Sequence, residues 1–292
     1  MYFGALWEDL EGQYGSIKCL GDATIDWEVQ KGSGEPQVES VSTVRCHKEV
    51  PQTITPTPVR LTPTPTVLAP TPTPQPIPRE GLVGHWKFDE DTGEVAKDSS
   101  EYGHDGSLTG VPTWIEGKFG GALSFDGVKD YVKISDVSEL RLSTTQTIST
   151  WYKWAGSGTD WRRLVGKGGD GKRNYGLWVN ADVGEVMFQI WGLPAHQGGC
   201  DAKSKVAFDT GWHHLAGTYD GAKIRLYYDG TLVDDQGCTA IPDTSSHSVT
   251  IGFANGDGVP MHSPFDGLID EVRVYNGKLS DCEILTLANR TC

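Results

Sequence analysis

The 292-residue sequence lacks an apolar run of about 20 residues, the length that a membrane-spanning helix needs. It also lacks a basic cluster: 25 Lys and Arg stand against 39 Asp and Glu, and the net charge of −14 divides as −5 over residues 1–50, +1 over 51–80 and −10 over 81–292. These absences argue against direct membrane insertion and against nucleic acid or anionic membranes as partners. An acidic surface is still compatible with neutral glycans and with bound cations.

No Cys-x-x-Cys spacing is present, which argues against a zinc cluster. The cysteine count is six, and an even number suits disulfides in an oxidising compartment, with free buried thiols as the alternative. Six cysteines allow fifteen pairings. Sequence order favours three local bridges: Cys19–Cys46, Cys200–Cys238 and Cys282–Cys292.

The first residues, MYFGALWEDLEG, lack the basic start and the long apolar stretch of a signal peptide. Everything that follows has the character of a secreted protein. We therefore expect an extracellular or cell-surface location, with the export signal upstream of this sequence.

Composition divides the chain into three parts. In residues 1–50, two strand-like runs, Ala23–Val29 and Val38–Cys46, predict a small β segment closed by the first bridge, possibly the end of a larger β domain. Residues 51–80 form a Pro/Thr-rich linker, because ten of the sixteen prolines fall within 51–78 and Thr-Pro alternation favours an extended spacer. Residues 81–292 form the main domain.

Short strand-like runs with turn signals between them recur through residues 81–292. The clearest case is Gly211–Gly230, where Asp220-Gly221 predicts a hairpin turn with positive φ at both residues. A capping box at Ser280 and Glu283 predicts one short helix. The expected fold is all-β, a two-sheet antiparallel sandwich or jelly roll. The expected strands are 82–88, 122–127, 130–135, 146–154, 162–168, 174–180, 185–191, 213–219, 223–229, 248–254 and 268–276.

Five segments stand in this order: GLVGHWKFDEDTGEVAKDSSEYGHDGSLTG, GKFGGALSFDGVKDYVKIS, TISTWYKW, GWHHLAGTYDGAKIRLYYDG and FDGLIDEVRVYNGKLSDCEI. Together they resemble the laminin-G-like jelly roll of the concanavalin A-like lectin/glucanase group. The resemblance covers residues 81–292 only. It implies that the first and last strands are adjacent, with Trp86–Asp89 beside Asp270–Tyr275. It also implies extracellular glycan or protein binding for most members, and glycosidase or lyase activity for a minority.

A glycosidase needs two carboxylates that flank the scissile bond. The resemblance implies a Glu-x-Asp-x-x-Glu strand in the catalytic members, and Glu-x-Asp occurs nowhere in this sequence. Adjacent carboxylates such as Asp270 and Glu271 face opposite sides of a strand. We therefore expect a protein that is not an enzyme.

Carboxylates in the first turn and the last strand suggest a metal. Asp270 shares a strand face with apolar residues and needs a partner, and the segment DEDTGEVAKDSS offers oxygen ligands that suit calcium. The resemblance makes a structural calcium ion plausible, with Asp89, Asp98 and Asp270 as candidate ligands. The alternative is that these are turn carboxylates and that Asp270 binds backbone amides.

Three loops combine aromatic residues, which stack on sugar rings, with polar hydrogen-bonding residues. The candidate ligand-binding residues are Trp154, Trp161, Arg162, Trp191, His196 and Asn255, with Arg163 beside Arg162. The alternative is that most tryptophans are core residues, and we assign Trp86, Trp151, Trp178 and Trp212 to the core.

The expected function is that of a non-catalytic, extracellular, carbohydrate-binding module on a Pro/Thr stalk. Its expected partner is a polysaccharide or glycoconjugate. The alternatives are a protein–protein adhesion or surface-assembly module that binds a surface protein, and a glycosidase or lyase of the same fold.

Overall fold

The computed structural model describes residues 24–25, 46–47, 75–155, 160–169, 172–193, 199–244, 246–254 and 263–292. Two compact units divide the chain, Met1–Ala69 and Pro70–Cys292. In the first unit, β1 (Thr24–Ile25) pairs antiparallel with β2 (Cys46–His47). Cys19 and most of the two predicted strands lie outside the described residues, so the Cys19–Cys46 bridge stays a prediction.

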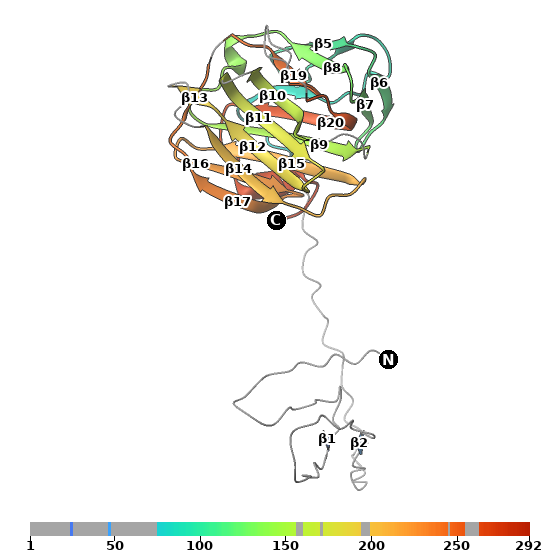
Figure 1. Ribbon diagram of the computed structural model, residues 1–292, viewed down its shortest axis with the longest axis vertical. Coiled ribbons are helices and arrows are strands. Elements are labelled where there is room, and N and C mark those ends of the chain that lie inside the picture. The colour runs from blue at the N-terminus through green and yellow to red at the C-terminus, as the bar shows by residue number, and fades with distance from the viewer. Residues whose placement is uncertain are drawn as a thin grey trace, which may run out of the picture. The chain divides into compact units, whose positions relative to one another are not determined.

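The second unit is a jelly roll of two antiparallel sheets, as predicted (Figure 1). The order of the first sheet is β14-β12-β11-β10-β19-β8-β5-β4. Its strands are β4 (Val95–Ala96), β5 (Gly106–Thr109), β8 (Tyr131–Ile134), β10 (Arg162–Gly169), β11 (Lys172–Asn180), β12 (Glu185–Ile190), β14 (Cys200–Lys205) and β19 (Val249–Ile251).

The order of the second sheet is β17-β16-β15-β9-β20-β7-β6, and β3 also pairs with β20. Its strands are β3 (Leu82–Trp86), β6 (Thr113–Glu116), β7 (Gly121–Asp126), β9 (Gln146–Trp154), β15 (Trp212–Tyr219), β16 (Lys223–Tyr228), β17 (Thr231–Gly237) and β20 (Asp266–Tyr275). The pairing of Val272 with Trp86 confirms that the first and last strands of the domain are adjacent. A small separate sheet joins β13 (Gly192–Leu193) to β18 (Ile241–Pro242).

The core lies between the two sheets because each strand alternates apolar residues toward the other sheet. Leu177 and Phe188 come from the first sheet, and Ile148 and Leu215 come from the second; all four are fully buried. The sheets approach closely at Gly217, where a Cβ would lie 2.1 Å from the Phe188 ring. Only glycine fits there.

The two Asp-Gly turns differ. Asp229 and Gly230 have φ of 48° and 77°, the two positive values that a type I′ turn requires. At the first turn the expectation was wrong: only Gly221 has positive φ, at 87°. The loop there has three residues, and the Asp220 carboxylate accepts hydrogen bonds from the amides of Ala222 and Lys223.

The 3₁₀ turn Ser138–Leu140 and the helix α1 (Asp281–Leu287) complete the domain. The helix begins at the predicted capping box, in which the Glu283 amide donates to Ser280 and the Glu283 carboxylate accepts from the Ser280 amide. Ile284 and Leu287 of α1 pack on the outer side of the second sheet with Ala216 and Tyr227. The helix therefore covers part of that face.

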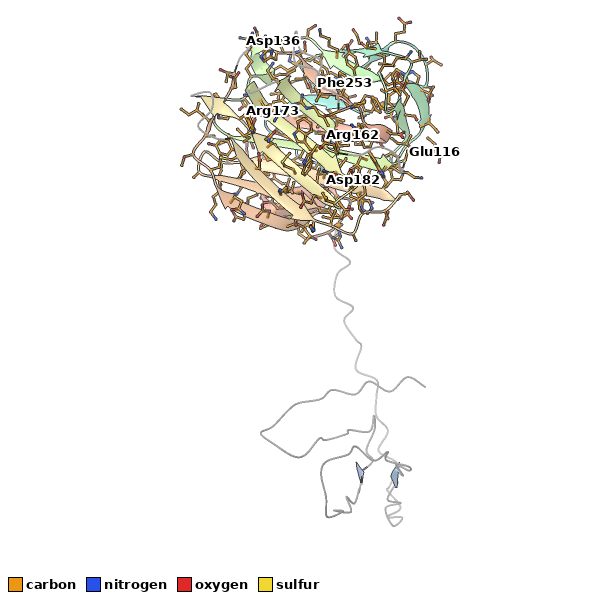
Figure 2. The ribbon with its side chains drawn as sticks, in the orientation of Figure 1. Glu116, Asp136, Arg162, Arg173, Asp182 and Phe253 are labelled. Carbon is orange, nitrogen blue, oxygen red and sulfur yellow. A yellow bond between two sulfur atoms is a disulfide. The ribbon has the colours of Figure 1, made fainter. Side chains whose placement is uncertain are left out.

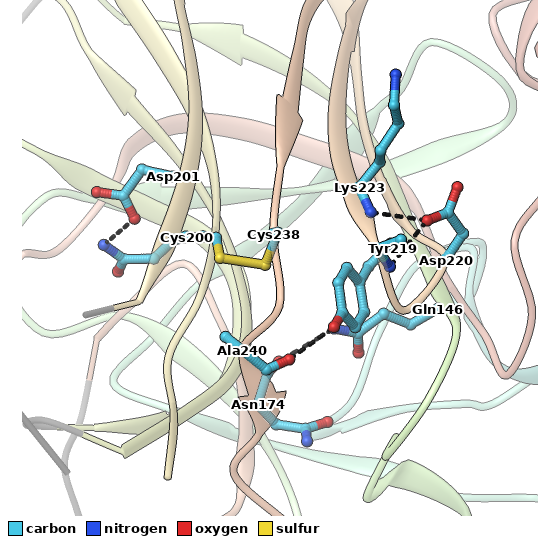
Figure 3. Close-up of a disulfide and its surroundings, with 11 residues drawn as sticks. Gln146, Asn174, Cys200, Asp201, Tyr219, Asp220, Lys223, Cys238 and Ala240 are labelled. Carbon is cyan, nitrogen blue, oxygen red and sulfur yellow. Dashed lines mark hydrogen bonds between the residues drawn. A yellow bond between two sulfur atoms is a disulfide. The ribbon is translucent and has the colours of Figure 1, made fainter. Parts of the chain in front are cut away.

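Two disulfides are formed as predicted, Cys200–Cys238 and Cys282–Cys292. Cys200 begins β14, the edge strand of the first sheet, and Cys238 follows β17, the edge strand of the second (Figure 3). This bridge therefore ties the two sheets together at one open edge of the sandwich. The other bridge joins the first turn of α1 to the last residue of the chain.

Candidate functional site

The outer face of the first sheet carries a second apolar cluster. In β11, Leu177 and Val179 face the core, so alternation places Trp178 on the opposite face. Trp178 is only 3% exposed, and it packs with Met187 of β12, Ala254 and Trp161 in a cluster separate from the core. Figure 1 shows β10, β11 and β12 side by side on the near side of the domain. A large aromatic side chain thus lies on the face of the sheet that points away from the core.

Two arginines extend this cluster into an alternating stack. The Arg163 guanidinium carbon lies 4.5 Å from the centroid of the Trp178 ring, and that of Arg173 lies 5.1 Å from it. Arg173 also lies 5.0 Å from the Trp191 ring centroid. These are cation–π distances. We call Arg163, Trp178, Arg173 and Trp191 the Arg–Trp stack.

A pair of glycines forms the floor beside the stack. Gly166 of β10 pairs with Gly176 of β11. A Cβ at Gly176 would lie 2.6 Å from Trp178 Nε1, and a Cβ at Gly166 would lie 3.1 Å from Arg163 Nε. The two missing side chains therefore allow the indole and the guanidinium to lie close to the sheet. We call Gly166 and Gly176 together the glycine floor.

Polar groups beside the floor are largely occupied by one another. Arg173 donates to Gln189 Oε1, and Gln189 Nε2 donates to Asp201 Oδ1 at 2.8 Å. Arg163 Nη1 donates to the Gly168 carbonyl at 2.8 Å. Burial, and to a smaller extent the charge of Arg173, lowers the pKa of Arg163 to about 9, so this guanidinium is still charged at neutral pH.

The structure brings two predicted residues to this face. Trp161 packs against the outer cluster and Trp191 ends the stack, and both are partly exposed. Arg162 pairs with Val179, a core residue, so Arg162 lies on the other face of β10 from Arg163. Arg162 and Arg173 lie at opposite ends of the β10–β11 pair (Figure 2). His196 and Asn255 lie outside the described residues.

The structure corrects the assignment of Trp154 as a ligand-binding residue. Its side chain is 4% exposed and packs in the core against the rings of Phe208 and Phe265, at centroid distances of 6.0 and 5.6 Å. β9 is a central strand, and Ile148, Tyr152 and Trp154 alternate toward the other sheet. We remove Trp154 from the candidate ligand-binding residues.

Sequence reasoning missed three residues of this face: Trp178, Arg173 and Gln189. Trp178 is buried, as expected of a core residue, but it is buried on the outer face. The available signal was the alternation in NYGLWVN (174–180), which separates Gly176 and Trp178 from Tyr175, Leu177 and Val179. The same alternation places Asn174 and Asn180 with Gly176 and Trp178, so it favours Tyr175, Leu177 and Val179 as the core face and Trp178 as an outward-facing residue.

The three candidate metal ligands do not form one group. Asp98 binds donors of its own turn and of β3: Oδ1 accepts from the amides of His85 and Ser100, and Oδ2 accepts from the Ser100 hydroxyl and the His104 amide. Within the described ranges, no group of three or more His, Cys, Asp or Glu side chains is placed to share an ion. The position of Asp98 fits the turn-carboxylate alternative.

Asp270 and Asp89 both bind the turn of residues 117–121. Asp270 Oδ2 accepts from the Phe119 amide at 2.9 Å, and Asp89 Oδ1 accepts from the Gly121 amide at 2.8 Å. Asp270 is fully buried, and its Oδ1 has no hydrogen-bond partner. Burial raises the pKa of Asp270 to about 7. Asp270 is therefore a buried carboxylate with one oxygen that makes no hydrogen bond, the kind of group that takes up a proton or binds a cation.

A different hollow, of about 230 Å³, lies beside the β15–β16 turn. Hydroxyl residues Ser143, Thr144 and Thr145 line it together with Asp220 and Tyr219. The Tyr219 hydroxyl donates to the Ala240 carbonyl at 2.6 Å (Figure 3). The Asp220 carboxylate accepts from Arg225 Nη1. Tyr219 and Asp220 are thus bonded within the protein, and no tryptophan is among the residues that line this hollow.

Comparisons with known proteins agree with this architecture. The family model described as the concanavalin A-like lectin/glucanases superfamily matches residues 126–285. No curated protein sequence matches the chain. Among the described residues, no helix has the length and the apolar character needed to cross a membrane.

Three solved structures show similar folds. Domain 4 of AbnA, a GH43 extracellular arabinanase from Geobacillus stearothermophilus, in complex with arabinotriose, is 23% identical, with a TM-score of 0.55 over 72% of this chain and 100% of that one. The binding domain of botulinum neurotoxin DC is similar in a complex with SialylT (13% identity, TM-score 0.56) and in a complex with rat synaptotagmin II (11%, 0.57). These two comparisons cover 72% of this chain and 52% and 51% of the neurotoxin chains. At such identities the likeness shows the fold alone.

Proposed function

Because the chain belongs to the concanavalin A-like lectin/glucanases superfamily, we propose that its jelly roll is a non-catalytic carbohydrate-binding module whose binding surface is the outer face of β10, β11 and β12. The observation that carries the proposal is the Arg–Trp stack beside the glycine floor. Its partner would be a polysaccharide or glycoconjugate outside the cell.

The chemistry of this face suits a sugar. A pyranose ring has an apolar C–H face that packs on an aromatic ring, and hydroxyls at its edge that need hydrogen-bond partners. Trp161 and Trp191 are partly exposed and offer ring surface. Arg173, Gln189 and Asp201 supply donors and acceptors next to them.

The described carboxylates of this face are not arranged as hydrolysis needs. Asp201 accepts a hydrogen bond from Gln189, and Glu185, four residues before Gln189 on β12, pairs with Lys203. Glycoside hydrolysis uses two carboxylates that flank the bond. We therefore propose binding without catalysis. Structures of the same fold bound to arabinotriose and to SialylT support a glycan, and the one bound to synaptotagmin II makes a protein the alternative outcome.

An extracellular location is part of the proposal. The Cys200–Cys238 and Cys282–Cys292 bridges are of the kind that forms and persists in oxidising compartments. The Thr-Pro-rich composition of residues 51–78 suits an extended spacer between the module and residues 1–50.

Replacing Trp191 by alanine tests the binding surface. Affinity electrophoresis on arabinan, xylan, mannan, β-glucan, polygalacturonate and alginate first identifies a polysaccharide that slows the full chain. We expect Trp191→Ala to bind that polysaccharide about tenfold more weakly, because a stacking surface is lost. Trp114→Ala, on β6 of the second sheet, is the matched control and should bind normally. If no polysaccharide is retained and a surface protein is captured instead, the glycan proposal fails.

We also propose a structural calcium ion at Asp270. The partnerless Oδ1 fits a cation, since a buried carboxylate needs a counter-charge. Asp270 and Asp89 would hold the ion, which would supply positive charge beside the 117–121 turn. Asp98 does not belong to this set, because its oxygens already accept four hydrogen bonds.

Asp270→Asn tests this carboxylate through pH. The folded pKa of about 7 lies above the unfolded value of 3.8, so the folded protein loses stability as pH rises from about 4 to about 7, and the loss is complete above 7. In EDTA at pH 8, the Asn variant should therefore be more stable than the unaltered chain by on the order of 4 kcal/mol, and the difference should disappear near pH 4.

Calcium should reverse that ranking. Added calcium should raise the Tm of the unaltered chain at pH 8, because an ion that binds only the folded state stabilises it, and it should leave the Asn variant unchanged. A melting curve that is the same in EDTA and in millimolar calcium would contradict the calcium proposal. It would leave the pH prediction for Asp270 standing on its own.

A further inference from the structure

Three hydrogen-bond donors beside the glycine floor have no acceptor. They are Nε and Nη2 of Arg163 and Nε1 of Trp178, and all three atoms are buried. Arg163 is 0% exposed and Trp178 is 3% exposed. A Cβ at Gly166 would lie within 3.1 Å of Arg163 Nε, and one at Gly176 within 2.6 Å of Trp178 Nε1. These two donors therefore flank the same pair of glycines.

The acceptors that lie closest along these strands are already bound. The Gly168 carbonyl accepts from Arg163 Nη1, and the Gln189 amide oxygen accepts from Arg173. The Asp201 carboxylate accepts from the Gln189 amide nitrogen. No ion pair joins Arg163 to a carboxylate among the described residues. A buried cation without a counter-ion costs several kcal/mol, so a site that retains one is expected to meet an anion.

We infer that the sugar bound at this face carries a carboxylate, as hexuronic and sialic acids do, and that Arg163 and Trp178 Nε1 bind that carboxylate above the glycine floor. The inference rests on the proposed function and narrows its ligand to acidic sugars. A carboxylate is acceptor-only, so it matches a cluster of donors; a neutral hydroxyl would also need an acceptor for its own proton. The planar guanidinium matches the two carboxylate oxygens in shape.

The net charge of the domain indicates that only a few aligned groups, and not the surface as a whole, would attract an acidic sugar. Residues 81–292 carry a net charge of −10, so the surface as a whole repels polyanions. Non-specific attraction cannot then account for binding to an acidic polysaccharide. Binding must come from a few aligned groups, and Arg163, with the charge of Arg173 nearby, is the cationic centre of this face.

The test compares each acidic polymer with its carboxyl-reduced form, in which the carboxylates have become primary alcohols. The probes are polygalacturonate, alginate, hyaluronate and polysialic acid, with arabinan as a neutral reference. The full chain is compared with Arg163→Met, which keeps an unbranched side chain without charge, and with Arg162→Met, the same change on the other face of β10. Affinities come from titration calorimetry, and each variant is also melted.

We expect at least one acidic polymer to bind about tenfold or more tightly than its reduced form. Arg163→Met should remove that preference without lowering the Tm, because it removes an unpaired buried charge, and Arg162→Met should keep the preference. Equal binding of acidic and reduced polymers, an unchanged preference in Arg163→Met, or a large fall in its Tm overturns the inference while the glycan proposal stands. If no polymer binds, acidic, reduced or neutral, both fail.

Discussion

Replacing Gly176 by valine should weaken glycan binding at least a hundredfold while the protein still folds. A Cβ at this position would lie 2.6 Å from Trp178 Nε1, and the branched side chain needs still more room. The Trp178 ring cannot move aside cheaply, because it packs against Met187 and Trp161 and between two guanidinium groups. The substitution therefore fills the glycine floor and displaces the Arg–Trp stack together.

Gly237→Val is the matched control. Gly237 ends β17 on the second sheet, and a Cβ there would meet no atom within 4 Å. Both variants place valine in a strand, where its β-propensity is favourable. Binding is read by affinity electrophoresis, and packing of the tryptophans by near-UV circular dichroism and melting. A Gly176→Val chain that binds as tightly as Gly237→Val would show that sugars bind elsewhere.

Removing the Cys200–Cys238 bridge should cost about 4 kcal/mol of unfolding free energy. The loop-entropy estimate for a separation of 38 residues gives about 4 kcal/mol, and for the 10-residue Cys282–Cys292 loop about 3 kcal/mol. The longer bridge also joins the edge strands of the two sheets, and Cys238 is 2% exposed. We therefore expect the double variant Cys200→Ser/Cys238→Ser to lose more stability than Cys282→Ser/Cys292→Ser.

Urea unfolding of the two double variants and of the unaltered chain measures this difference. Alanine in place of serine at Cys238 separates the loss of the covalent bond from the cost of burying a hydroxyl. Loop length and burial both give the Cys200–Cys238 bridge the larger contribution. A larger loss from the C-terminal pair would contradict it and would place the weak point of the domain at α1.

The sequence was sufficient to predict the sandwich because its central strands alternate clearly. β9, β15 and β16 were predicted within one residue at each end, and the Ser280 capping box placed α1. The strands that were missed include β14 and β17, whose sequences CDAKSK and TLVDDQG are mostly polar. Both are edge strands, where one side of the ladder faces solvent and the hydrophobic pattern fades.

The site was only half predictable. Aromatic residues in loops pointed to Trp161 and Trp191, because exposed aromatics next to polar residues are typical of binding surfaces. Trp154 was assigned to ligand binding but is buried in the core, whereas Trp178 was assigned to the core and is buried, in the cluster on the outer face of the first sheet. Both stand in strands, where alternation shows which residues share a face, but what covers each face depends on tertiary packing. The glycine floor arises from the register that pairs Gly166 with Gly176, and that register is a tertiary property.

Oxidative footprinting of the glycan complex tests the central claim most directly. The full chain, saturated with the polysaccharide that it retains best, is exposed to hydroxyl radicals, and the oxidation rate of each tryptophan is read by mass spectrometry. We predict that the bound glycan slows oxidation of Trp161 and Trp191 several-fold and leaves Trp114 of the second sheet unchanged. A glycan that binds but leaves Trp161 and Trp191 as reactive as in the free protein would contradict the assignment of the outer face of β10, β11 and β12 as the binding surface.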